Sequence, residues 1–185
     1  MSTPITLTLG PQDGTLTLHT GAEGRAAKMG HALTIAMTDW SAEVALEGGQ
    51  PTAVSFRTRL ASLDVVKGDG GLKPLSDKDK RTVKDSALET LDAAKHPEVT
   101  FTGRDVTARD GGYEIAGELV IAGVTRALSM QVVVSREAGR ARVSAEVPVV
   151  QTEFGIKPYS GLMGGLKVRD RVDVRLEATA ADPGV

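Results

Sequence analysis

The sequence has no cysteine, and six of its 185 residues are aromatic: one Trp, two Tyr and three Phe. Without cysteine the chain cannot form disulfides, cysteine-ligated zinc sites or iron–sulfur clusters, and it has no thiol nucleophile. In place of aromatic side chains it carries 20 valines and 18 threonines. These β-branched residues favour strands, so the composition indicates a β-rich protein whose core is built largely from small side chains.

An excess of charge of one sign is also missing, with 22 Lys and Arg against 24 Asp and Glu. Nucleic-acid-binding proteins carry a basic surface for the phosphates, and this balance does not provide one. Residues 1–15 lack the positive region and the apolar run of a secretory signal. No stretch approaches the roughly 18 consecutive apolar residues of a transmembrane helix. We therefore expect a cytoplasmic protein with no integral membrane segment and no nucleic-acid partner.

Apolar and polar residues alternate with a period of two through most of the chain. In residues 54–60, Val54 and Phe56 lie on one face while Ser55 and Arg57 lie on the other. This pattern is typical of strands with one buried face, whereas strands of parallel sheets read as continuous apolar runs. It predicts an antiparallel sheet that closes into a barrel or folds into a two-sheet sandwich. The alternating segments are residues 5–9, 15–19, 30–37, 43–47, 54–60, 99–102, 114–121, 128–134, 143–149 and 172–176.

One region departs from this alternation. Residues 76–95 are rich in helix formers, and Ser76 with Asp79 resembles a capping box. The region follows a glycine-rich stretch, residues 67–75, which we predict to be a loop. We therefore expect one or two short helices that are inserted between strands and lie over one end or side of the sheet.

The residues that could carry chemistry are few. The histidines His19, His31 and His96 lack the spacing of a metal site, so we expect no metal, and no nucleophile motif is present. His31 shares the predicted inward face with Leu33 and Ile35. It is either a core histidine with a hydrogen-bond partner or a polar group that holds a ligand's headgroup at the mouth of an apolar cavity. We assign no catalytic residue.

A second glycine-rich segment, residues 160–167, contains the apolar residues Leu162, Met163 and Leu166. It lacks the spacing of a phosphate-binding loop. Apolar side chains on an exposed loop are unfavourable unless they pack against something. The segment therefore predicts either a flap over a cavity or a contact between two copies of the chain.

Three blocks of sequence occur in a specific order. The first leads from a helix through His96 and Pro97 to Phe101, the second runs from Gly117 to Thr125, and the third contains a Phe-Gly-Ile motif before the last strand. This ordered set resembles the YceI-like, polyisoprenoid-binding family over roughly residues 15–178. The chain departs from the family pattern in two places, at Met37–Trp40 and at Gln151–Thr152. The three blocks are residues 91–106, 117–130 and 148–178.

The resemblance implies an all-β fold: an extended, antiparallel, lipocalin-like barrel of about eight strands, with a short helical insertion around residues 76–95. It implies a single domain over residues 1–185. It also implies a binding or carrier protein, rather than an enzyme, that holds a hydrophobic small molecule, a long-chain amphiphile such as a polyisoprenoid, in an apolar cavity. We expect no cofactor besides that ligand, and the family's relatives suggest a homodimer.

An eight-stranded barrel is just filled by its side chains, so small inward residues leave room for an alkyl or prenyl tail. We expect Met163 in the flap, and His31 at the headgroup with Lys157, Tyr159 or Lys167 near it. The inward positions predict as the cavity wall Leu33, Ile35, Val54, Phe56, Phe101, Leu119, Ile121, Val147, Val149 and Phe154.

Two other functions stay open from the residues. One is a lipid-modifying enzyme that uses His31 as general acid or base, although no partner nucleophile is evident. The other is a dry-cored barrel that acts through its surface, for example as a stress-related interaction module. In that case residues 160–167 would form an interface.

Overall fold

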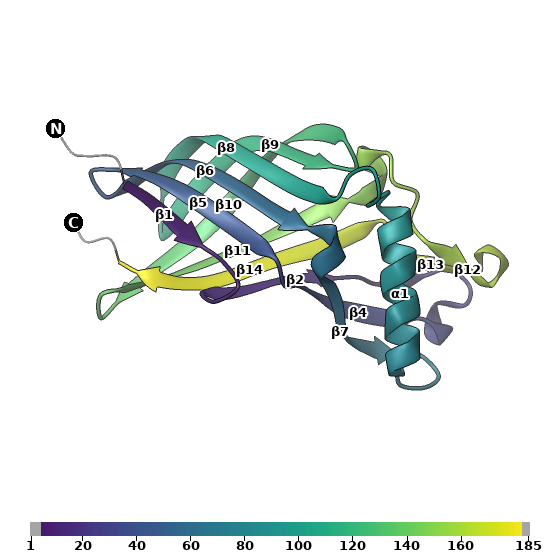
Figure 1. Ribbon diagram of the computed structural model, residues 1–185. Coiled ribbons are helices and arrows are strands. Elements are labelled where there is room, and N and C mark those ends of the chain that lie inside the picture. The colour runs from purple at the N-terminus through teal and green to yellow at the C-terminus, as the bar shows by residue number, and fades with distance from the viewer. Residues whose placement is uncertain (1–4, 183–185) are drawn as a thin grey trace.

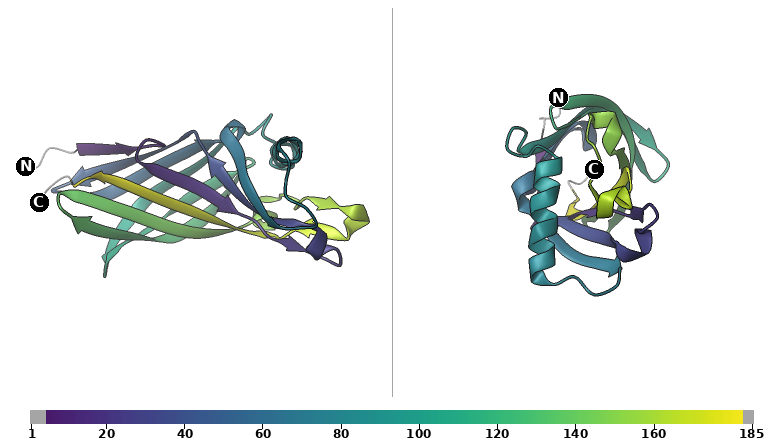
Figure 2. Two further views of the ribbon diagram at one scale, coloured as in Figure 1. Left: turned by 90° about the horizontal axis from the view of Figure 1, so that it is seen from below. Right: turned by 90° about the vertical axis from the view of Figure 1, so that its right-hand side faces the viewer.

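The structure, a computed structural model, describes residues 5–182, and most of them belong to one large antiparallel sheet (Figure 1). The sheet curls about a central axis, as the end-on view in Figure 2 shows. Its strand order is β1-β5-β6-β8-β9-β10-β11-β14-β2-β4-β7. The strands are β1 (Ile5–Leu9), β2 (Gly14–His19), β4 (His31–Met37), β5 (Trp40–Glu47), β6 (Gln50–Arg59), β7 (Leu63–Gly70), β8 (Glu98–Arg109), β9 (Gly112–Ile121), β10 (Val124–Glu137), β11 (Arg140–Val150) and β14 (Arg171–Ala181).

The predicted fold class is confirmed, because the sheet is antiparallel, curled and lipocalin-like. The predicted strand number is wrong: within residues 5–182 the main sheet has eleven strands, not about eight. Each alternating segment coincides with one of these strands or extends one residue beyond it, and β7 is the additional strand. The expectation of a loop over residues 67–75 is also corrected, since β7 continues to Gly70. A bulge at Val66, where β7 pairs with β4, interrupts the period of two and hides this strand in the sequence.

Three short segments carry the chain from one edge region of the sheet to the other. They are residues 10–13 between β1 and β2, residues 38–39 between β4 and β5, and η2 (Leu60–Ser62) between β6 and β7. The amide of Arg59 donates to the carbonyl of Asp39 at 3.0 Å, which ties two of these crossings together. In the described residues β1 and β7 do not pair with each other. The crossings therefore form a seam that closes the barrel without a continuous hydrogen-bond ladder.

The helix α1 (Asp77–Thr90) occupies the predicted helical region (Figure 1). The capping box is present: the Asp79 amide donates to Ser76 Oγ at 3.1 Å, and the Ser76 amide donates to Asp79 Oδ2 at 2.9 Å. Lys80 Nζ donates to the Val66 carbonyl at 3.0 Å, which fastens the helix to β7. The helix therefore protects an edge strand whose backbone would otherwise be open to pairing.

Among the described residues, no helix is both long enough and apolar enough to cross a bilayer.

A second, smaller sheet projects from the barrel at the end where α1 lies, away from the start of β1 and the end of β14 (Figures 1 and 2). Its strand order is β12-β13-β3. We call residues 21–30 and 157–169 together the end lobe. The elements of the end lobe are β3 (Ala22–Glu23), η1 (Ala27–Met29), β12 (Ser160–Gly161), η4 (Leu162–Gly164) and β13 (Leu166–Val168).

Two clusters of buried apolar side chains form the core. The seam cluster lies under the crossings, and apolar residues of α1 pack against it. It consists of Leu9, Leu16, Ile35, Met37, Trp40, Ala42, Leu60, Leu63, Val65, Ala178 and Ala180. The end cluster joins β8 and β9 to the segment after β11. It consists of Phe101, Ile115, Leu119, Ile121, Phe154 and Ile156.

Candidate ligand-binding cavity

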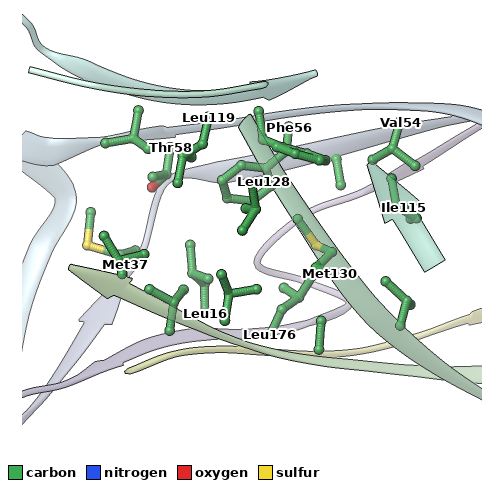
Figure 3. Close-up of a pocket in the computed structure, with 18 of the residues that line it drawn as sticks. Leu16, Met37, Val54, Phe56, Thr58, Ile115, Leu119, Leu128, Met130 and Leu176 are labelled. Carbon is green, nitrogen blue, oxygen red and sulfur yellow. The ribbon is translucent and has the colours of Figure 1, made fainter. Parts of the chain in front are cut away.

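The barrel contains a cavity of about 210 Å³ whose lining includes members of both clusters (Figure 3). One water molecule requires about 10–15 Å³ of such space, so this is a large hollow rather than a packing defect. Side chains from opposite sides point towards one another across it, among them Phe56 and Leu176 (Figure 3). The side chains of the barrel therefore do not fill its interior.

The lining is apolar apart from Thr58. Thr58 Oγ1 donates to the Asp39 carbonyl at 2.9 Å, so this hydroxyl already has a partner. No lining side chain is titratable, and the cavity is therefore suited to an apolar chain rather than to a charged or strongly polar molecule. The lining residues are Leu9, Leu16, Leu18, Met37, Ala42, Val44, Val54, Phe56, Thr58, Leu60, Val99, Phe101, Ile115, Leu119, Leu128, Met130, Val132, Val143, Ala145, Val147, Val149, Val174 and Leu176.

One part of the lining is less tightly packed than the rest. We call it the open wall, and it consists of the inward residues of three neighbouring strands, β10, β11 and β14. All of them except Val147 remain only half-buried, although they point into the barrel. The diameter of a barrel grows with its strand number, and small side chains cannot span the enlarged interior. The residues of the open wall are Leu128, Met130, Val132, Val143, Ala145, Val147, Val149, Val174 and Leu176.

The ladder between β10 and β11 is interrupted beside this wall. The two strands pair over residues 132–137 and 140–145, but in the described structure they have no further pairs towards the α1 end. Pro148 lies in the unpaired stretch of β11, where its missing N–H costs no ladder bond to β10. Near the end of the gap, Arg126 Nε donates to the Glu153 carbonyl at 2.8 Å. In this stretch of the described structure, therefore, no backbone ladder joins β10 to β11.

At the α1 end, η3 (Gln151–Phe154) carries Phe154 into the end cluster. Thr152 fastens this turn: its amide and its Oγ1 donate to the two carboxylate oxygens of Asp170 at 2.9 and 2.6 Å. The hydrogen bonds from the Thr152 side chain and backbone lower the pKa of Asp170. The carboxylate thus stays charged and holds the turn that closes this end of the barrel.

The chain's one tryptophan lies next to the cavity. The Trp40 and Phe56 rings stack with centroids 6.5 Å apart, and Phe56 is a lining residue. Trp40 is buried, and its Nε1 has no hydrogen-bond partner in the described structure. The fluorescence of Trp40 can therefore report changes inside the barrel without a second tryptophan to obscure them.

The structure brings several of the predicted wall residues together. They come from β6, β8, β9 and β11, which are far apart in the sequence or separated by hairpins. The period of two placed them on the inward face, and curling of the sheet directs them to one space. The predicted residues that line the cavity are Val54, Phe56, Phe101, Leu119, Val147 and Val149.

Four other predicted residues pack in or against the clusters and do not line the cavity. Ile35 belongs to the seam cluster and Leu33 packs against it. Ile121 and Phe154 belong to the end cluster. The direction of these side chains agrees with the sequence pattern, but their position along the barrel axis places them beyond the hollow.

The predicted polar and flap residues lie outside the cavity. His31 Nε2 is within 2.8 Å of the Lys73 carbonyl, so the ring fastens the loop that precedes α1. Lys157, Tyr159 and Met163 are exposed in the end lobe, as is Lys167. His31 thus has a backbone partner, but it is only half-buried and does not belong to the core. The segment expected as a flap forms the end lobe instead of covering the lining.

The predicted cavity wall contained only Val147 and Val149 of the open wall, although the alternation placed the other residues on inward faces too. Leu128, Met130 and Val132 share one face of the alternating segment 128–134, and Ala145 shares a face with Val143. An alternation with a period of two marks all inward residues alike, so it does not show which of them border an empty space.

Within residues 5–182, no group of three or more His, Asp or Glu side chains is placed to hold a metal ion.

Comparison with known proteins gives the family. The crystal structure of BcnA from Burkholderia cenocepacia superposes with a TM-score of 0.67 at 16% identity, covering 91% of this chain and 96% of that one. A YceI protein from Campylobacter jejuni gives 0.61 at 15% identity, covering 81% and 85%. No curated protein matches the chain. The family model for the YceI-like domain matches residues 8–180, and the chain therefore belongs to the YceI-like family.

Proposed function

We propose that the protein binds a single long-chain amphiphile, of the polyisoprenoid class, in the barrel cavity and carries or sequesters it. The observation that carries this proposal is a hollow of about 210 Å³ lined by apolar side chains and one already paired hydroxyl. Each buried CH₂ group contributes about 0.8 kcal/mol, so a long hydrocarbon chain binds there through burial alone.

The interrupted ladder between β10 and β11 is the proposed route of entry. Leu128 and Met130 on one strand and Val147 and Val149 on the other belong to the lining, and these strands are unpaired in that stretch. Opening a wall without backbone bonds costs less than breaking a ladder. The contact between Arg126 and the Glu153 carbonyl would have to loosen as the chain enters.

The two alternatives have less support. An enzyme that uses His31 would need this ring at the cavity, but its Nε2 meets the Lys73 carbonyl instead. A dry-cored barrel would have an interior filled by side chains, and the hollow argues against that.

The test is a binding titration with prenyl alcohols of increasing length, beginning with farnesol. Quenching or a spectral shift of Trp40 fluorescence follows binding, and native mass spectrometry gives the stoichiometry, expected to be one chain per protein. Ala145→Phe should weaken binding by about tenfold or more, because the new ring occupies the hollow from the open wall. Ala127→Phe, on an exposed outward position of β10, is the matched control.

Two outcomes would contradict the proposal. One is the absence of any bound species with prenyl alcohols, as well as with fatty acids and in an organic extract of the purified protein. The other is binding that Ala145→Phe leaves unchanged while that variant stays folded, since the chain would then lie outside the barrel.

A further inference from the structure

Exposed apolar side chains gather at one end of the molecule. Of the eight large hydrophobic residues that are exposed in residues 5–182, five lie in the end lobe or in the loop between β7 and α1. His31 connects these two regions, because its ring meets Lys73 of that loop and it directly follows Gly30 of the end lobe. The five residues are Met29, Leu72, Tyr159, Leu162 and Met163.

Leu162 and Met163 form the tip of the end lobe. Their exposed fractions are 55% and 104%, so Met163 makes almost no contact with the rest of the protein. Both have positive φ angles, 49° and 55°, in a turn closed by a bond from the Gly165 amide to the Leu162 carbonyl. Glycine and asparagine adopt this left-handed conformation most readily, and large apolar residues disfavour it. Neither local folding nor packing within the chain accounts for Leu and Met at these two positions.

The charge of the end lobe is opposite to that of the whole chain. It contains five basic residues and one acidic residue, while the whole chain has a net charge of −2. The acidic residue, Glu23, is the cross-strand partner of Lys167. None of the five cations forms an ion pair among the described residues, and all five are exposed. They are Arg25, Lys28, Lys157, Lys167 and Arg169.

We propose that the end lobe docks the protein on an anionic lipid bilayer, with Leu162 and Met163 inserted between the headgroups and the surrounding cations over the lipid phosphates. An apolar tip among Lys and Arg residues is the chemistry of a segment that lies in the membrane interface. The tip is a narrow projecting turn (Figure 1), whereas a protein partner generally needs a surface of roughly 800 Å² on each side. The shape and the charge together favour the bilayer.

This inference stands apart from the ligand proposed above, because the tip is not part of the cavity lining. Docking would bring the α1 end of the barrel to the bilayer, where long-chain amphiphiles reside. A protein that binds prenyl alcohols but ignores vesicles would overturn only the docking. A protein that binds vesicles but no prenyl chain would overturn only the proposed ligand.

The absence of cysteine makes a direct test simple, because one introduced thiol is the only labelling site. Met163→Cys and the control Val133→Cys, an exposed residue of β10, are labelled with an environment-sensitive fluorophore. Vesicles of phosphatidylcholine containing phosphatidylglycerol should shift the emission of the label at position 163 to the blue, whereas the label at 133 should not respond. High salt or vesicles of pure phosphatidylcholine should abolish most of the shift.

Two unlabelled variants separate apolar insertion from charge attraction in a vesicle sedimentation assay. Leu162→Asn with Met163→Asn should reduce binding by about tenfold or more, and the turn should stay intact because asparagine tolerates positive φ. Lys157→Gln with Lys167→Gln should reduce binding by roughly fivefold per charge. Arg140→Gln with Arg142→Gln, at the far end of β11, is the control and should change little.

The proposal is overturned if vesicles leave the label at position 163 unchanged, or if the Asn pair binds vesicles as well as the parent chain. It is also overturned if the shift at 163 grows with protein concentration in the absence of vesicles and sedimentation shows a dimer. In that case a second copy of the chain, and not lipid, would cover the tip.

Discussion

The two sides of the barrel interior are built from the same alternation but differ in packing. Under the seam, Leu63 is 1% exposed, and Trp40, Met37 and Leu60 are nearly as buried. In the open wall, Val143 and Val174 point inward yet stay half-buried. The seam cluster is covered by a helix, whereas the open wall consists mostly of valine and borders empty space. An inward direction is therefore not the same as a packed position.

The largest expected difference comes from removing side-chain volume on each side. Leu63→Ala should lower the free energy of unfolding by about 3–5 kcal/mol, because a closely packed site leaves a cavity behind. Val143→Ala should cost less than about 1 kcal/mol, because its methyl groups already border the hollow. Urea unfolding of the two variants measures the difference. Equal losses would show that the open wall is packed in solution.

Adding volume should likewise destabilise a packed site, here one beside the end cluster, more than the open wall. At Gly103 a Cβ atom would lie 2.5 Å from Ile115 Cγ2 and 2.9 Å from the Phe101 ring, so Gly103→Ala should destabilise the protein by about 1–3 kcal/mol. Ala145→Leu adds more atoms but places them in the hollow, and it should leave stability unchanged or raise it. Thermal unfolding of both variants provides the measurement. If Ala145→Leu destabilised the protein as much as Gly103→Ala does, the open wall would be as closely packed as the site around Gly103.

Removing the N-terminal cap of α1 should weaken only the side of the barrel where the seam lies. Ser76→Ala should cost about 1 kcal/mol, because it removes the oxygen that accepts from the Asp79 amide. Hydrogen exchange should then speed up in α1 and β7, which α1 fastens through Lys80, and remain unchanged in β10 and β11. A uniform increase over all strands would mean that the helix supports the whole barrel rather than one edge.

The smallest effect concerns the turn that closes the α1 end. The pKa of Asp170 is lowered in the folded protein, so its contribution to stability is present above the ordinary value of 3.8 and is lost as the pH falls through and below it. Thr152→Ala should reduce the melting temperature slightly at neutral pH, and this difference should vanish in acid. A difference that persists at low pH would show that Thr152 acts through packing and not through the carboxylate.

The sequence supported a large part of this description. Alternation located ten of the eleven strands of the main sheet, and the capping residues Ser76 and Asp79 marked the start of α1. Strand β7 was missed because the bulge at Val66 breaks the period. The strands of the end lobe were missed because β3, β12 and β13 are only two or three residues long, too short to show a period.

For the cavity, residue pattern and structure contributed different information. The sequence by itself determined which side chains face inward, because pleating sends alternate residues to opposite faces wherever the chain is a strand. It also determined that these side chains are small and that few aromatic rings are available. Only the tertiary structure decided that eleven strands curl around a space wider than those side chains can fill, and that His31 lies outside it. The width of a barrel is a property of all its strands together, so no local pattern records it.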